Sequence, residues 1–199
     1  FERDNAIGGL LRYGIPNFKL EKRIIDRRVA VLEAEGITFK TNVNVGVNYS
    51  VDQLSAFDSI VLCGGATERR SLPTKGIESK GVFQAMTFLT QQTKSLYGEV
   101  IPDQIRATGK DVIVIGGGDT GSDCVGTSNR HGAKSVTNFE ILPKPPVGRS
   151  ETTPWPFWPL QLKTSSSHEE GCNRNWLINT KEFISNESGQ LTGLKTVEV

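Results

Sequence analysis

The sequence has few cysteines, little net charge and no long apolar run, and each shortage excludes a class of protein. Its 199 residues include three cysteines, Cys63, Cys124 and Cys172, with no C-x-x-C pair. This argues for a reducing, cytoplasmic compartment and against a zinc or iron–sulfur site built from this chain alone. A formal net charge of +1 would recruit neither nucleic acid nor an acidic membrane surface. The apolar runs are far shorter than a membrane span.

The two ends of the sequence indicate a segment of a longer protein. It begins with Phe1 rather than Met, with no signal peptide, and it stops within "LKTVEV", which reads as the middle of a strand.

Hydrophobic periodicity predicts alternating helices and strands. Helical spacing runs from Leu20 to Leu32 and again between Gly81 and Gly98, with Gly36 and Gly98 as helix ends. "ITFKTNVNVG" alternates like a strand, "SVDQLSAF" is a short capped turn, and "FDSIVLCGG" reads as a buried strand.

The second half of the chain continues this α/β pattern. "KDVIVIG" is expected to be a parallel strand covered on both faces, followed by a helix from about Thr120 to His131 and the strand "KSVTNFEIL". "PKPPVGRSETTPWPFWP" reads as a long irregular loop, which in a compact domain is more often functional than idle. The last segment is predicted to be a hairpin turning at "NESGQ".

The stretch "VIGGGDTG" indicates a dinucleotide site. Gly116, Gly118 and Gly121 have the G-x-G-x-x-G spacing, in which the first glycine permits a tight turn, the second admits a pyrophosphate and the third allows close helix packing. The helix N-terminus beyond it offers N–H groups to the anion. We therefore predict that the cofactor contacts the whole turn, namely Gly116, Gly117, Gly118, Asp119, Thr120 and Gly121.

The residues after this turn disagree about which nicotinamide cofactor is used. Glu140, at the end of the next strand, is placed to hold a ribose 2′-hydroxyl, which favours NADH. Lys144 and Arg149 in the loop beyond could bind a 2′-phosphate, although a solvated loop charge is an equally open reading of both. We favour NADPH narrowly, with NADH as the alternative.

The first residues suggest a second dinucleotide site. "FERD" resembles "FEIL" at 139–142, so Glu2 could be a second ribose-binding acid whose glycine loop lies upstream. A solvated residue near a chain end is an equally open reading of Glu2.

Five ordered stretches carry a family resemblance over nearly the whole chain. They are "FERDNAIGGLLRYGIPNFKL", "VLCGGATERRSLP", "GGGDTGSDCVGTSNRHGAKSV", "FEILPKPP" and "TSSSHEEGC". Together they resemble the small (β) subunits of glutamate synthases and their relatives.

The resemblance implies a Rossmann-like, parallel-sheet NAD(P)H domain inserted in a partial FAD domain of the same general type. The corresponding domains are 1–75 for FAD and 76–199 for NAD(P)H, with a return to the FAD domain near the C-terminal end left open. FAD in the full-length protein would contact Glu2, Gly8, Gly9, Gly65, Ala66 and Thr67.

The resemblance also implies a function. NAD(P)H would pass hydride to FAD, and electrons would travel through iron–sulfur clusters, held by segments absent here, to the large subunit that forms glutamate. Because the cofactors perform this chemistry, we expect no catalytic acid or base and no metal ligand in this chain.

Other readings stay open at this stage. One is a related electron-input module of the dihydropyrimidine dehydrogenase or ferredoxin:NADP reductase type, and another is a nucleotide-binding module without electron transfer. The segment alone is expected to be inactive and to self-associate through exposed FAD-domain surface.

Overall fold

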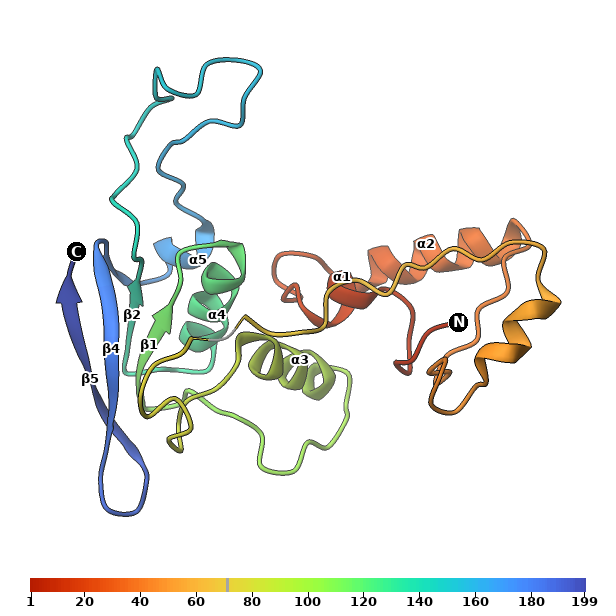
Figure 1. The fold of residues 1–199 in the computed structure, drawn as a ribbon, viewed down its shortest axis with the longest axis horizontal. Coiled ribbons are helices and arrows are strands. Elements are labelled where there is room, and N and C mark those ends of the chain that lie inside the picture. The colour runs from red at the N-terminus through yellow and green to blue at the C-terminus, as the bar shows by residue number, and fades with distance from the viewer. Residues whose placement is uncertain (71) are drawn as a thin grey trace. The chain divides into compact units, whose positions relative to one another are not determined.

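The computed structural model describes residues 1–70 and 72–199, which group into two compact units (Figure 1). One unit comprises Phe1–Arg70 with Thr93–Glu99, and the other comprises Ser71–Gln92 with Val100–Val199. That these units are the FAD and NAD(P)H domains expected at 1–75 and 76–199 stays a prediction. No helix in the described part of the chain is long and apolar enough to cross a membrane.

The first unit contains short helices joined by irregular chain. Its elements are α1 (Gly9–Tyr13), α2 (Lys22–Ala34) and the 3₁₀ helix η1 (Val51–Ala56). Helix α2 matches the predicted helix, and Gly36 just beyond it has the positive φ of 97° that a left-handed helix end requires. Ser50 caps η1 by accepting a hydrogen bond from the Asp52 N–H, as the predicted capped turn requires.

The buried side chain of Lys22, the first residue of α2, binds the segment that precedes this helix. Lys22 is 1% exposed, and its ammonium group donates to the backbone carbonyls of Leu11, Ile15 and Leu20. These carbonyls replace the water that the charge loses on burial, so the contact stabilises the unit only while all partners are present.

Two predicted strands of the first unit are not strands. Residues 37–46 form a single isolated bridge, Val45 to Tyr49, and residues 57–65 form none. Val61 and Leu62, expected to be buried, are 82% and 87% exposed. The first segment makes a short backbone contact with the start of the chain, in which the Glu2 N–H donates to the Lys40 carbonyl and the Val43 N–H donates to the Glu2 carbonyl, each at 2.9 Å. A strand needs a neighbour along its length to satisfy its backbone hydrogen bonds, and no described strand lies beside 57–65.

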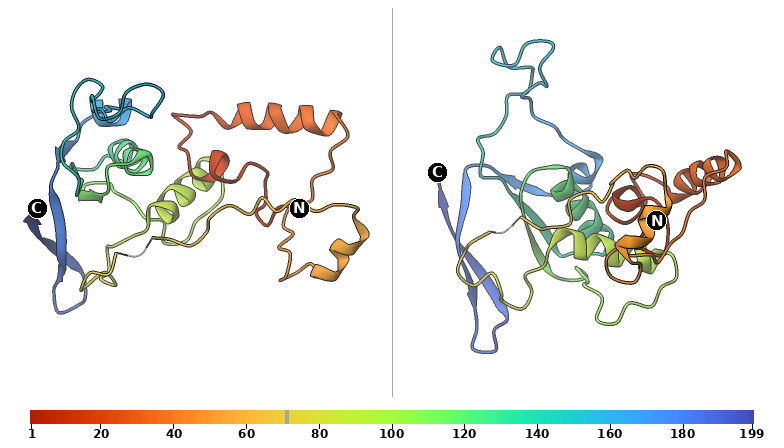
Figure 2. Two further views of the ribbon diagram at one scale, coloured as in Figure 1. Left: turned by 45° about the horizontal axis from the view of Figure 1, so that its top comes forward. Right: turned by 45° about the vertical axis from the view of Figure 1, so that its right-hand side comes forward.

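The second unit is built on a parallel sheet, as predicted. Strands β1, β2 and β3 lie in that order, β1 pairing with β2 from Asp111–Ser135 to Ile115–Phe139. Helix α4 connects β1 to β2 and packs on the sheet, as the views in Figure 2 show. The predicted final hairpin is β4 paired with β5. The bounds are α3 (Ala85–Leu96), β1 (Asp111–Ile115), α4 (Asp119–Arg130), β2 (Ser135–Phe139), α5 (Ser166–Glu169), β3 (Asn173–Asn175), β4 (Ile178–Ser185) and β5 (Leu191–Glu198).

The core of this unit lies between α3, α4 and one face of β1. Phe88 and Leu89 of α3 meet Cys124 of α4, and Val114 of β1 packs against them. Burial, and then the nearby Asp123 carboxylate, raise the pKa of the Cys124 thiol to about 12. Cys124 is therefore a small apolar core residue rather than a reactive thiol.

The other face of β1 is not covered as expected. Ile113 and Ile115 are 44% and 42% exposed, because the described helices pack on the face that carries Val114. The prediction that both faces of this strand are covered is wrong for the described part of the chain.

Replacement of Lys22 by Met should destabilise the region of α1 and α2. The change leaves three backbone carbonyls without their charged donor, which we expect to cost about 3 kcal/mol. Hydrogen–deuterium exchange of residues 9–34 measures the loss. Arg23→Met, which removes an exposed neighbouring charge, is the matched control, and equal exchange in the two variants would contradict the role given to Lys22.

Candidate dinucleotide-binding site

The glycine-rich turn follows β1 at the carboxyl edge of the sheet, where parallel sheets bind ligands. Gly116 has a φ of 116°, and its N–H donates to the Phe139 carbonyl at 2.8 Å, so the turn is joined to β2. A Cβ on Gly121 would lie 2.2 Å from the Gly116 carbonyl oxygen. The first turn of α4 therefore lies directly against the chain leaving β1, and only glycine permits that approach.

A buried side chain of β2 holds the same turn. Asn138 is 2% exposed, and its amide nitrogen donates to the carbonyls of Val114 and Gly116 at 3.0 and 2.9 Å. Val114 is the register partner of Asn138, whereas Gly116 lies beyond the last pair of the two strands, Ile115 with Phe139. Asn138 thus positions the start of the turn, a role that its place in a strand pattern did not indicate.

Glu140 folds back onto the turn. Its Oε2 accepts a hydrogen bond from the Gly117 N–H at 2.7 Å, and its Oε1 accepts one from the Leu142 N–H at 3.2 Å. A Cβ on Gly117 would lie 2.1 Å from that Oε2. The structure therefore brings Glu140 to the turn, and two backbone donors partly compensate its charge.

Gly118 leaves the space in front of α4 open. It is the N-cap residue, with extended backbone at φ −78°, and an added Cβ would meet nothing within 4 Å. Asp119 and Thr120 follow it on an exposed first turn. The early N–H groups of this 12-residue helix therefore face an approach that no side chain blocks, which suits an anionic group.

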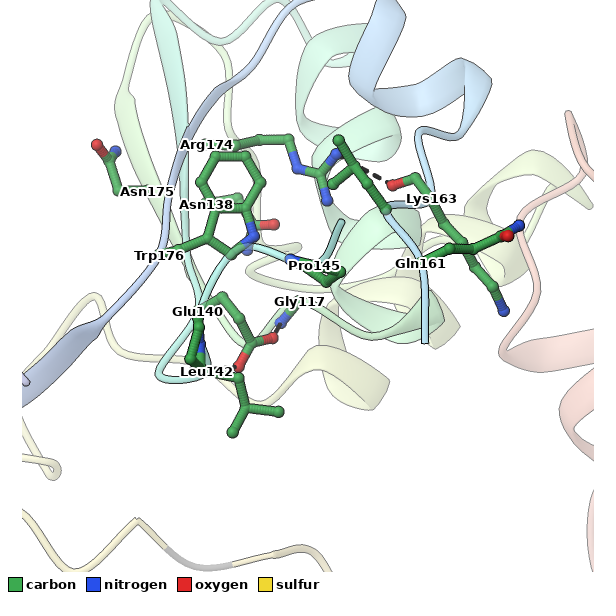
Figure 3. Close-up of a pocket in the computed structure, with 12 residues that line it drawn as sticks. Gly117, Asn138, Glu140, Leu142, Pro145, Gln161, Lys163, Arg174, Asn175 and Trp176 are labelled. Carbon is green, nitrogen blue, oxygen red and sulfur yellow. Dashed lines mark hydrogen bonds between the residues drawn. The ribbon is translucent and has the colours of Figure 1, made fainter. Parts of the chain in front are cut away.

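A cavity of about 160 Å³ opens beside Gly117 (Figure 3). Asn138 of β2 and Glu140, the residue that follows β2, contribute to it, as do Arg174 of β3 and Trp176, the residue that follows β3. The strap, which we define as the irregular segment 142–165 between β2 and α5, supplies the remaining wall. Arg174 and Trp176 were not among the sequence candidates, because a three-residue strand is too short to show a period.

The two cations predicted from the strap occupy different places. Lys144 lies with its Nζ 5.0 Å from the ring centroid of Trp176, beside the cavity. Arg149 lies farther along the strap, where its guanidinium donates to the carbonyls of Thr153 and Phe157 at 3.0 and 3.2 Å. Arg149 thus stabilises a turn of the strap, and it does not line the cavity.

The residues predicted to contact FAD lie in the first unit. The Glu2 carboxylate accepts the Asp4 N–H at 2.9 Å, and Gly8 and Gly9 have φ values of 133° and 49° at the start of α1. Gly65, Ala66 and Thr67 are exposed. Within the described residues no group of three or more His, Cys, Asp or Glu gathers to hold a metal.

Comparison with known proteins gives the chain's relatives. No family model matches it. It is 49% identical to the glutamate synthase [NADPH] small chain of Mycobacterium tuberculosis, over all of this chain and 42% of that protein. It is 47% identical to glutamate synthase [NADH] of Saccharomyces cerevisiae, over all of this chain and 10% of that protein. The resemblance to glutamate synthase small chains is confirmed. The chain spans about two-fifths of the length of the bacterial small chain.

Solved structures confirm the Rossmann-like α/β fold. FprA from Mycobacterium tuberculosis, determined in complex with NADPH, matches with a TM-score of 0.64 over 94% of this chain and 57% of FprA. The sequence identity is 15%, so this likeness supports the fold and not a shared function.

Replacement of Gly121 by Ala should lower the stability of the second unit. Alanine improves helix propensity, but its Cβ would overlap the Gly116 carbonyl, so we expect a net loss of about 2 kcal/mol. Gly118→Ala, at an open position, should stay within about 1 kcal/mol of the unchanged protein. Chemical denaturation of both variants tests this, and an equal loss would contradict the close packing.

Proposed function

We propose that this chain is part of the electron-input subunit of a glutamate synthase and that its second unit binds NAD(P)H. The observation that carries the proposal is the glycine turn, held open at Gly118 between β1 and α4 beside Glu140. The relatives along the whole chain support the same assignment, since they are named as NADPH- or NADH-dependent glutamate synthases.

Each part of the turn has a proposed role. Gly116–Gly118 and the first N–H groups of α4, at Asp119, Thr120 and Gly121, would hold the pyrophosphate. Glu140 faces the adenosine ribose. When bound, the cofactor would supply a hydride for FAD in the full-length protein, and this chain would bind and orient the donor.

The proposed nicotinamide cofactor is NADPH, and NADH is the alternative. Lys144, beside the cavity, is a proposed contact of the 2′-phosphate. Arg149 stays a predicted contact, and its hydrogen bonds within the strap suggest an indirect contribution.

The remaining partners are proposed from the relatives. FAD would use Glu2, Gly8, Gly9 and Gly65–Thr67 together with segments outside residues 1–199. Iron–sulfur clusters, also outside these residues, would carry electrons to a large subunit that forms glutamate, in the cytoplasm. The dihydropyrimidine dehydrogenase-like and ferredoxin:NADP reductase-like alternatives are less favoured, because the most similar relatives reported above are glutamate synthases.

Gly118→Ala in the full-length protein tests the cofactor assignment. The added methyl would occupy the path of the pyrophosphate, so we expect the Kd for NADPH to rise by about 10-fold or more, which is about 1.4 kcal/mol. Anaerobic flavin reduction by NADPH, followed at increasing cofactor concentration, measures this. The FAD content should not change, and an unchanged concentration dependence would refute the assignment.

The chain of residues 1–199 should not hold FAD tightly by itself. It carries one G-x-G-x-x-G turn, which we assign to NAD(P)H, and no second glycine loop for the flavin pyrophosphate. The purified chain should therefore be colourless after dialysis against flavin-free buffer. A flavin absorption band that survives dialysis would show that the Glu2 and Gly65–Thr67 segments suffice.

A further inference from the structure

We infer that Arg174 determines whether the site prefers a 2′-phosphorylated cofactor, an inference that rests on the proposed NAD(P)H function. Arg174 lies on β3, outside the strand–turn–helix motif and more than thirty residues beyond Glu140. Its guanidinium lines the same cavity as Glu140 and Gly117 (Figure 3).

The register of the sheet places Arg174 and Glu140 on one face. Asn138 of β2 pairs with Arg174 of β3 in parallel, so these two side chains point the same way. Glu140 and Trp176 each follow two residues later, and the Glu140 N–H donates to the Asn175 carbonyl, which continues the pairing. Strand alternation therefore directs an acid, a guanidinium and an indole to the ribose end of the proposed site.

The guanidinium of Arg174 is already oriented. Its carbon lies 5.0 Å from the ring centroid of Trp176, and one terminal nitrogen donates to the Lys163 carbonyl at 3.1 Å and to Thr164 Oγ1 at 3.4 Å. These contacts use part of a group that carries five N–H donors. The rest of the fork is held at the cavity wall, in the planar form that binds phosphate in a bidentate manner.

The cations of the strap have other partners or lack the fork geometry, although Lys163 also contributes to the cavity lining. Lys163 lies with its Nζ 4.2 Å from the ring centroid of Trp158, and Arg149 donates to two strap carbonyls. Lys144 shares Trp176 with Arg174, but its ammonium is a single point charge and does not form a fork. Arg174 is therefore the side chain best placed to discriminate between a 2′-phosphate and a 2′-hydroxyl.

Two ligands that differ only in the 2′-phosphate isolate this contact. The probes are adenosine 2′,5′-bisphosphate and adenosine 5′-monophosphate, titrated by calorimetry into the full-length protein. The unchanged protein should bind the bisphosphate more tightly. Arg174→Met keeps the packing on Trp176 and removes the charge. It should weaken binding of the bisphosphate by roughly 10- to 100-fold, as expected for the loss of a charge-assisted pair, and binding of the monophosphate by less than about 3-fold.

Further variants separate charge, geometry and position. Arg174→Lys should restore part of the lost affinity, because it returns the charge without the fork. Arg106→Ala removes one exposed positive charge of the same unit at a position that does not line the cavity, and it should change both affinities by less than about 2-fold.

Four outcomes would overturn the inference. Equal weakening of both probes by Arg174→Met would make Arg174 a structural residue, and no weakening would remove it from the site. If Arg149→Ala but not Arg174→Met selectively lowers the affinity for the bisphosphate, a residue of the strap distinguishes the 2′-phosphate from the 2′-hydroxyl. If the unchanged protein binds neither probe and neither NADPH nor NADH, the proposed function fails together with the inference. Binding of NADPH or NADH with no effect at Arg174 refutes the inference alone.

Discussion

The geometry of the second unit depends on one close backbone approach, between the Gly116 carbonyl and Gly121. A Cβ at Gly121 would lie 2.2 Å from that oxygen, so α4 can begin against the end of β1 only with glycine there. The same carbonyl accepts a hydrogen bond from the buried Asn138 amide, and Glu140 accepts one from the Gly117 N–H. The turn is therefore held from β2 by an amide and a carboxylate, and this arrangement orients the N-terminus of α4 before a ligand arrives.

At the proposed ribose end, a negative and a positive side chain have electrostatic effects of similar size on a 2′-phosphate. A carboxylate about 5 Å from a 2′-phosphate raises its energy by about 3 kcal/mol per unit charge at an effective dielectric constant near 20, and a cation at that distance lowers it by as much. Two backbone N–H groups bind Glu140, whereas Arg174 lies over Trp176 with donors still available. Both carboxylate oxygens of Glu140 already accept a hydrogen bond, while Arg174 keeps further donors for a phosphate, so a glutamate at this strand end is compatible with a phosphorylated cofactor.

Local sequence patterns predicted the strand–turn–helix unit but not the composition of its site. The runs "DVIVIG" and "KSVTNF", the glycine spacing and the helix after it determine β1, β2, α4 and the place of the turn. Arg174 and Trp176 join the site through the pairing of β2 with β3, which brings together residues far apart in the chain. No periodicity marks a three-residue strand, so the positive charge that lines the cavity together with Glu140 emerges only from the sheet register.

Two apolar runs that end in glycine show why the same sequence pattern forms a strand in one place and not in another. "SIVLCGG" and "DVIVIGG" have the same pattern, yet 111–115 is a strand and 59–65 is exposed chain. The difference is that β1 has β2 beside it, linked to it by α4, whereas the first run has no paired neighbour among the described residues. Unpaired backbone beside Ile60, Val61 and Leu62, each more than half exposed, favours association with another strand. The tendency to self-associate that we expect of this segment thus has the same physical cause as the incorrect strand prediction.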